Sequence, residues 1–148
     1  MKYLIKGGTV VDPSGNVDGA LDILVSDGII LEIGRSIQAK DAKVIDAGGM
    51  IVAPGLIDMH VHLREPGRED EETVLTGTRA AAKGGFATVV CMPNTDPALD
   101  NAEVLIKLRA IISKDAIVNV LPAGAITIGR LGKDLADIKA MVKEGIVA

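Results

Sequence analysis

The strongest constraint on the fold is a repeat that begins after the Pro54-Gly55 pair. Short apolar runs, separated by amphipathic stretches, start near Leu56, Ala87, Ala116 and Ile146. A spacing of about thirty residues is the length of one strand and helix unit in a parallel sheet. The sequence therefore predicts an α/β fold in which strands alternate with helices that cover them.

Three helices are expected between these strands. The first is predicted from about Glu69 to Lys83, with acids in its first turn and Gly84-Gly85 at its end. The second is predicted to begin near Asp100, where Glu103 follows three positions later as in a capping box. The third is expected from about Asp134 to Glu144, again followed by a glycine.

Three strand and helix units and the start of a fourth strand predict an incomplete TIM-like (β/α) barrel. A closed barrel of eight units typically needs ~250 residues, whereas the chain has 148. Unpaired backbone groups would remain on the strand containing Ala116 to Leu121, or on the next one. We therefore expect the rest of the barrel in a longer polypeptide, or a partner chain, to complete this edge.

The first fifty or so residues have a different pattern, in which brief Val, Ile and Leu runs are broken by Gly, Asp and Pro. The Asp27-Gly28 pair between two such runs predicts a two-residue hairpin turn. These features predict a small β-sandwich segment. The change of pattern near Val52 predicts two domains, the sandwich segment at 1–52 and the first part of the barrel at 53–148.

Composition excludes several classes of partner. Sixteen basic and twenty acidic residues give a net charge of −4, and the basic residues are scattered, which argues against nucleic acid. No uncharged run reaches the length of a membrane span, and the start lacks the long apolar core of a signal peptide. The single cysteine, Cys91, is consistent with a reducing compartment. We therefore expect a cytoplasmic protein without a membrane partner.

His60 and His62 are the only histidines of the chain, and they close the first strand of the repeat. Side chains alternate along a strand, so both imidazoles are expected on one face, where they could chelate one metal ion. Barrel enzymes place their active sites at this end of the strands. The alternative is a pair of partly buried structural histidines. By the same alternation, Asp58 is expected to share their face, either to orient a ligand or to pack below it.

Two further polar residues are expected at the same rim. The planar guanidinium of Arg64 suits a substrate carboxylate, although a salt bridge to Glu65, Glu69 or Asp70 explains it equally well. Asn94 follows the second strand and could donate a hydrogen bond to an anion, but an Asn beside Pro is more often a turn residue.

The stretch from Pro54 to Gly67, which reads PGLIDMHVHLREPG, closely resembles the start of the barrel in dihydroorotases of the amidohydrolase superfamily. Further similarity lies in Thr76–Ala82 and in Gly84–Met92, and the Met-Pro-Asn-Thr segment that ends at Thr95 is the most discriminating. Allantoinases share the His-x-His and Arg-Glu-Pro-Gly motifs but usually differ after Met-Pro. Dihydropyrimidinases are more distant and commonly lack the arginine at position 64.

The resemblance implies a zinc-dependent hydrolase of a cyclic amide, with one or two zinc ions. His60 and His62 would be metal ligands, while His62, Arg64 and Asn94 would line the substrate pocket. The implied reaction converts N-carbamoyl-L-aspartate reversibly into dihydroorotate, a small-molecule step of pyrimidine biosynthesis. The remaining ligands and the acid-base aspartate are expected beyond Ala148, so no catalytic residue is assigned within the chain.

Several alternatives remain open at this point. Residues 1–148 alone are expected to be inactive, because two histidines supply about half of the roughly four ligands that zinc requires. The complete protein could instead be an allantoinase or another cyclic amidohydrolase. A truncated, non-catalytic interaction protein is the alternative outside the enzymes. The resemblance does not decide whether a homo-oligomer forms.

Overall fold

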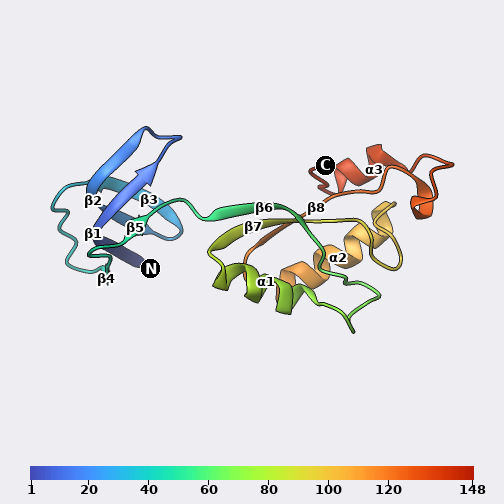
Figure 1. The fold of residues 1–148 in the computed structure, drawn as a ribbon, viewed down its shortest axis with the longest axis horizontal. Helices are drawn as coiled ribbons and strands as arrows, with labels where there is room; N and C mark the ends of the chain where they lie inside the picture. The colour runs from blue at the N-terminus through green and yellow to red at the C-terminus, as the bar shows by residue number, and fades with distance from the viewer. The chain divides into compact units, whose positions relative to one another are not determined.

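The computed structural model describes residues 1–148, which divide into two compact units, Met1–Pro54 and Gly55–Ala148 (Figure 1). The first unit contains only strands, and the second contains strands that alternate with helices. No helix of either unit is both long enough and apolar enough to cross a lipid bilayer.

The first unit is a single five-stranded sheet, and no second, facing sheet forms within these residues. Its strands follow the order β3-β2-β1-β4, and the short β5 pairs with the far part of β1. Pairing is antiparallel between β1, β2 and β3, and parallel between β1 and both β4 and β5. The strands are β1 (Lys2–Asp12), β2 (Val17–Ser26), β3 (Ile29–Gly34), β4 (Lys43–Asp46) and β5 (Ile51–Val52).

The predicted hairpin between β2 and β3 is present. Asp27 and Gly28 both have positive φ angles, 51° and 81°, as a two-residue turn of this hand requires. A bulge between Ile5 and Gly8 interrupts the register of β1 with β2, and Gly7 lies there with a φ of 78°. The bulge lets one long strand pair with β4 before it and with β5 after it.

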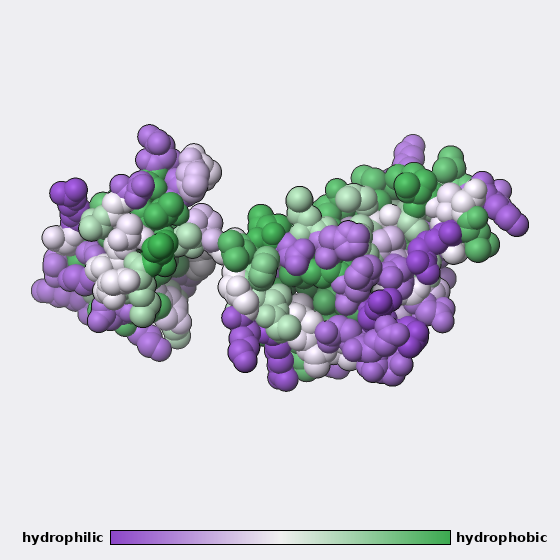
Figure 2. All heavy atoms as spheres, viewed as in Figure 1, coloured by the Kyte–Doolittle hydropathy of each residue, from purple (hydrophilic) through white to green (hydrophobic).

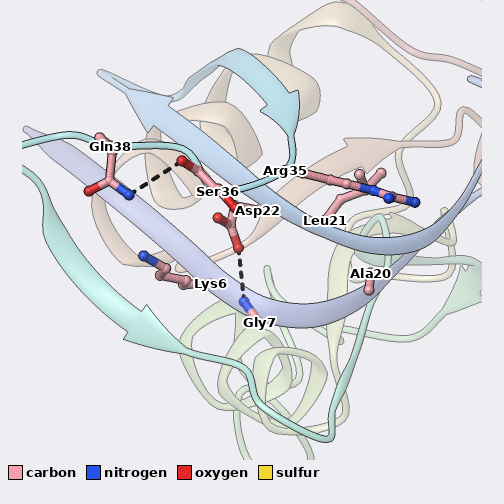
Figure 3. Close-up of a pocket in the computed structure, with 8 residues that line it drawn as sticks. All are labelled: Lys6, Gly7, Ala20, Leu21, Asp22, Arg35, Ser36 and Gln38. Carbon is pink, nitrogen blue, oxygen red and sulfur yellow. Dashed lines mark hydrogen bonds between the residues drawn. The ribbon is translucent and has the colours of Figure 1, made fainter.

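The buried carboxylate of Asp22 on β2 forms hydrogen bonds with β1 and with the segment after β3. Its carboxylate accepts hydrogen bonds from the backbone N–H of Gly7 at 3.0 Å and of Ile37 at 3.1 Å. Figure 3 shows it between β1 and the segment after β3, in a hollow that also contains Ser36 and Gln38. Both carboxylate oxygens are satisfied by main-chain donors, so we regard Asp22 as a structural residue of this unit.

The second unit contains one parallel sheet of three strands in the order β6-β7-β8. The strands alternate with helices along the chain, as the thirty-residue repeat predicts. The elements are β6 (Leu56–Val61), α1 (Val74–Lys83), β7 (Phe86–Cys91), α2 (Ala102–Asp115), β8 (Asn119–Pro122), the short 3-10 helix η1 (Ile128–Arg130) and α3 (Ile138–Lys143).

The core of the second unit lies between this sheet and its helices (Figure 1). It is built from aliphatic side chains, consistent with the near absence of aromatic residues, and one cluster joins β7, β8 and all three α-helices. The fully buried members are Leu99, Leu105, Leu108, Met141, Val74 and Val89. Helix α2 contributes its predicted stripe, with Val104, Leu105 and Leu108 buried and Ile111 and Ile112 partly buried.

Two of the three helices begin later than predicted. Helix α1 begins at Val74 instead of Glu69, because Thr73 forms the N-cap and the acids before it lie in turns. Helix α3 begins at Ile138 instead of Asp134, with Asp137 as its N-cap. Helix α2 begins close to the predicted position, but Asn101 rather than Asp100 caps it by accepting from the N–H of Val104.

Large apolar side chains are exposed on the second unit. On the sheet they include Ile57, Met59 and Leu121, and near the end of the chain they include Ile126, Leu131 and Leu135. Figure 2 shows apolar atoms gathered over the region of β6 and α3. The predicted fourth strand near Ile146 is not formed, but Val147 donates a 3.0 Å backbone hydrogen bond to Pro122 on β8.

Candidate functional site

The carboxyl ends of β6 and β7 place three of the candidate residues at one edge of the parallel sheet. His60 lies within β6, and His62 follows the end of that strand at Val61. Asn94 comes three residues after β7 ends at Cys91. Parallel neighbouring strands end at the same edge, so their following residues meet there.

The two imidazoles lie next to each other. Their ring centroids are 5.1 Å apart, and the rings are inclined at 66° in an edge-on arrangement. Both side chains are exposed. Two imidazoles that are this close and accessible can present nitrogen lone pairs to one metal ion.

Asn94 makes a side-chain hydrogen bond with one of these rings. Its Oδ1 lies 2.7 Å from Nδ1 of His62. With the amide oxygen as acceptor, Nδ1 carries the hydrogen, so the lone pair of the neutral ring is on Nε2. Asn94 thereby leaves Nε2 of His62 free for a metal and keeps its own N–H donors for another group.

Asp58 lies two residues before His60 on β6. The register of β6 with β7 shifts between Asp58 and Val61, because Asp58 pairs with Val89 and Val61 pairs with Cys91. The carboxylate of Asp58 accepts a 3.1 Å hydrogen bond from the backbone N–H of His60. Asp58 and His62 both line a groove next to α1. That Asp58 shares the face of the histidines stays a prediction.

Arg64 reaches the same edge, but not by continuation of the strand. Its backbone turns into the left-handed region, with a φ of 60°. Its Nε lies 3.0 Å from a carboxylate oxygen of Glu71, and the arginine is half-buried. Arg64 therefore pairs with Glu71, and not with Glu65, Glu69 or Asp70 as the sequence analysis considered.

Arg64 and Asn94 line one open hollow of about 580 Å³. The loops after β6, β7 and β8 all contribute to it. Its other lining residues include Arg68, Asp96, Asp100, Gly129 and Arg130. Three arginines line the hollow against two aspartates, and this excess of positive charge suits a small anion such as a carboxylate.

Two contacts hold the three loops together around this hollow. Asp96 donates a 3.0 Å backbone hydrogen bond to Pro66, which joins the loops after β6 and β7. A carboxylate oxygen of Asp100 accepts a 2.6 Å hydrogen bond from the N–H of Gly129, which joins the loops after β7 and β8. The hollow is thus bounded by backbone segments whose separation is fixed.

Ionisable groups near the site are shifted by their partners. The hydrogen bond from Arg68 lowers the pKa of Asp70, and the same contact raises the pKa of Arg68. Burial raises the pKa of the Cys91 thiol to about 11. Cys91 is therefore a protonated core residue at neutral pH, in agreement with its having no chemical assignment.

No third His, Cys, Asp or Glu joins the two histidines in a cluster that could hold a metal ion. As ligands, His60 and His62 would provide two of the roughly four positions that zinc takes in proteins. The donor types, their proximity and the free Nε2 of His62 nevertheless fit a zinc ion, as one part of a larger ligand set.

Comparison with known proteins identifies the family. The sequence profile described as dihydro-orotase-like matches residues 49–148. A dihydroorotase of Geotalea daltonii is 52% identical over 149 residues, which cover 100% of this chain and 35% of that relative. A dihydroorotase of Pelotomaculum thermopropionicum is 53% identical over 148 residues, again with 100% of this chain and 34% of the relative covered.

The chain belongs to the dihydro-orotase-like family. The predicted resemblance to dihydroorotases is confirmed, and it extends over the whole chain. The dihydro-orotase-like chain spans about a third of the length of the curated relatives that it matches, 35% for the first of them.

Solved structures that are similar to this dihydro-orotase-like chain include hydantoinases. The L-hydantoinase (dihydropyrimidinase) of Arthrobacter aurescens superposes with a TM-score of 0.84 at 26% sequence identity. The match covers 98% of this chain and 31% of that structure.

Two residues that the sequence analysis did not single out lie at the site of this dihydro-orotase-like chain. Glu71 pairs with Arg64, and Arg130 lines the hollow. Glu71 belongs to a run of acids that was expected to begin the first helix, which concealed its role. Arg130 lies in the long connection between β8 and α3, where the sequence analysis identified no motif.

Proposed function

We propose that residues 1–148 are the amino-terminal part of a zinc-dependent dihydroorotase. The complete enzyme would catalyse the reversible hydrolysis of the ring amide of dihydroorotate to N-carbamoyl-L-aspartate in pyrimidine biosynthesis. The proposal rests on one arrangement above all. A metal-competent histidine pair is joined through Asn94 to a hollow that Arg64 also lines.

In this proposal His60 and His62 hold one zinc ion, and the missing ligands come from the rest of the protein. The chemistry that zinc supplies when bound in such a site is activation of a water molecule, whose pKa falls to about 7, and polarisation of the amide carbonyl. The Asn94 amide oxygen keeps Nδ1 of His62 protonated and so directs Nε2 toward the metal position.

Arg64 and Asn94 would bind the carboxylate of the substrate. A guanidinium and an amide N–H group are both donors, and a charge-assisted hydrogen bond is about twice as strong as a neutral one. Anchoring the ring by its carboxylate places the scissile amide next to the histidine pair, because Asn94 contacts His62 and lines the hollow at once.

The same proposal covers the architecture. Residues 53–148 would be the first three strand and helix units of a (β/α) barrel with the start of its fourth strand, and residues 1–52 a segment of a β-sandwich. The rest of the polypeptide would cover the exposed Ile57, Met59 and Leu121. The protein would act in the cytoplasm on a small-molecule substrate, and a homo-oligomer is compatible with this assignment.

Hydantoin hydrolysis is the second candidate, because the structural similarity to the L-hydantoinase reaches a TM-score of 0.84. Hydantoin and dihydrouracil rings lack the carboxylate of dihydroorotate, so they lack the group that Arg64 and Asn94 would bind. The hollow therefore favours a substrate that carries a carboxylate.

The test is a substrate panel on the complete, zinc-loaded protein. We expect turnover of dihydroorotate and of N-carbamoyl-L-aspartate, with little turnover of allantoin, hydantoin or dihydrouracil. Turnover of allantoin or hydantoin without dihydroorotate would refute the proposal. Absence of turnover on every ring would favour the non-catalytic alternative.

A further inference from the structure

Four side chains of alternating charge form a continuous chain in the loop after β6. Asp70 binds Arg68 through two hydrogen bonds, of 2.9 and 3.1 Å. Arg68 then contacts Glu71 at 2.5 Å, and the other oxygen of Glu71 lies 3.0 Å from Nε of Arg64. Glu71 is thus the one acid that contacts both arginines.

The 3.0 Å contact with Glu71 is made at Nε of the Arg64 guanidinium. Nε lies on the side edge of the planar fork, whereas the two terminal nitrogens form the end that can bind a carboxylate in a bidentate way. A partner at Nε therefore restricts the rotation of the fork.

The backbone of Arg64 gives this contact its importance. Arg64 lies beyond the end of β6 and has a φ of 60°, so no strand neighbour orients its side chain. Glu71 is held by its own turn, in which its N–H donates to the carbonyl of Arg68 at 3.0 Å. Arg68 in turn donates its N–H to the carbonyl of Arg64 at 3.1 Å. The turn brings the carboxylate to Arg64 and fixes it there.

We propose that Glu71 is a positioning residue for substrate binding, which acts by orienting the Arg64 guanidinium toward the carboxylate of the substrate. This inference rests on the proposed function, since it assumes that the substrate carries a carboxylate. Glu71 also separates the positive charges of Arg64 and Arg68, which would otherwise repel each other across the turn. Asp70 contacts Arg68 alone and serves as the matched control.

The experiment compares Glu71→Gln with Asp70→Asn in the complete zinc-loaded protein. For Glu71→Gln we expect KM for dihydroorotate to rise about fivefold, the upper range for one partly exposed ion pair. The value of kcat, the zinc content and the melting temperature should stay close to those of the parent. Asp70→Asn should leave KM unchanged, because it removes a charge from the same loop without contacting Arg64.

A double-variant cycle separates positioning from a general electrostatic effect. If Glu71 acts through Arg64, Glu71→Gln should not raise KM further in an Arg64→Ala background. The proposal is overturned by an unchanged KM in Glu71→Gln, by an equal rise in Asp70→Asn, or by a full additional rise in the Arg64→Ala background. A parent protein without dihydroorotate turnover would instead refute the proposed function, and the Glu71 proposal with it.

Discussion

Asn94 Oδ1 and His62 Nδ1 lie 2.7 Å apart, and this contact links the histidine pair to the hollow that Arg64 and Asn94 line. The two residues are 32 positions apart in the sequence and follow different strands. One amide can serve both the histidine pair and the hollow, because its oxygen accepts from the imidazole while its nitrogen remains available as a donor.

Substitutions of Asn94 should separate these two tasks in the complete protein. Asn94→Asp keeps an oxygen acceptor for His62 but places a negative charge beside the substrate carboxylate, so we expect zinc content to be retained and KM for dihydroorotate to rise. Asn94→Ala removes the acceptor as well, so zinc affinity should fall about tenfold. Zinc titration and steady-state kinetics measure both effects. Equal zinc affinity in the two variants would argue against the role of the amide oxygen.

The histidine pair should be required for metal content as well as for turnover. We expect His60→Ala and His62→Ala each to lower the zinc content of the complete protein and its hydrolytic activity together, because each removes one of about four ligands. Metal analysis by atomic absorption, after dialysis against a weak chelator, checks the prediction. Loss of activity with full zinc content would show that the histidines act in another way.

Arg64 should chiefly affect substrate binding. Removing a charged hydrogen-bonding partner costs about 1.5 to 3 kcal/mol, so Arg64→Ala should lower kcat/KM for dihydroorotate by about ten- to a hundredfold, mainly through KM. Arg79→Ala, on the exposed side of α1, is the control and should leave both constants unchanged. An unaltered KM in Arg64→Ala would contradict the carboxylate role.

Much of the second unit follows from the sequence because periodicity encodes it. The thirty-residue repeat and the apolar stripe of α2 predict the alternation of strands and helices that the structure contains. The first residues of α1 and α3 were predicted less well than the elements themselves. The sequence did not single out Thr73 and Asp137 as the N-cap residues among the acids near them. Local capping geometry decides these ends, and several residues in each segment could provide it.

Candidate site residues could be named from the sequence only where a motif contains them. His60, His62, Arg64 and Asn94 were singled out because each lies at or after the end of an expected strand, within a recognisable stretch of sequence. Their roles stay predictions. The register shift between Asp58 and Val61 was not predicted, because no pattern of residues in β6 indicates a bulge. The ion pair between Glu71 and Arg64 was not predicted. It depends on the left-handed backbone turn at Arg64, which the spacing of the two residues does not indicate.

Gly67 should be irreplaceable where the loops after β6 and β7 meet. Its φ is 103°, and an added Cβ would lie 1.7 Å from the carbonyl oxygen of Asp96. We expect Gly67→Ala to lower the free energy of unfolding by about 3 kcal/mol or more, because both strain and a backbone clash arise. Gly85→Ala is the matched control. Its φ is 84° with no atom within 4 Å, so it should cost only about 1 kcal/mol.

Urea denaturation of the complete protein measures these two glycine variants, and kinetics give a second readout. Gly67 lies between Arg64 and the loop that carries Asn94, so its substitution should also raise KM for dihydroorotate. Similar stabilities for the two variants would mean that the loops can separate without cost.

The Cys91 thiol should resist alkylation in the folded protein. Burial raises its pKa from 9.0 to about 11, which lowers the thiolate fraction at pH 8 by about a hundredfold relative to a free thiol. The reaction rate with iodoacetamide should therefore keep rising with pH beyond 9.0, whereas in urea it should level off near that value. Peptide mass spectrometry after timed labelling measures the modification at Cys91. A plateau near pH 9 in the folded protein would show that the thiol is accessible to water, and that the core between β7 and α2 is looser than the structure indicates.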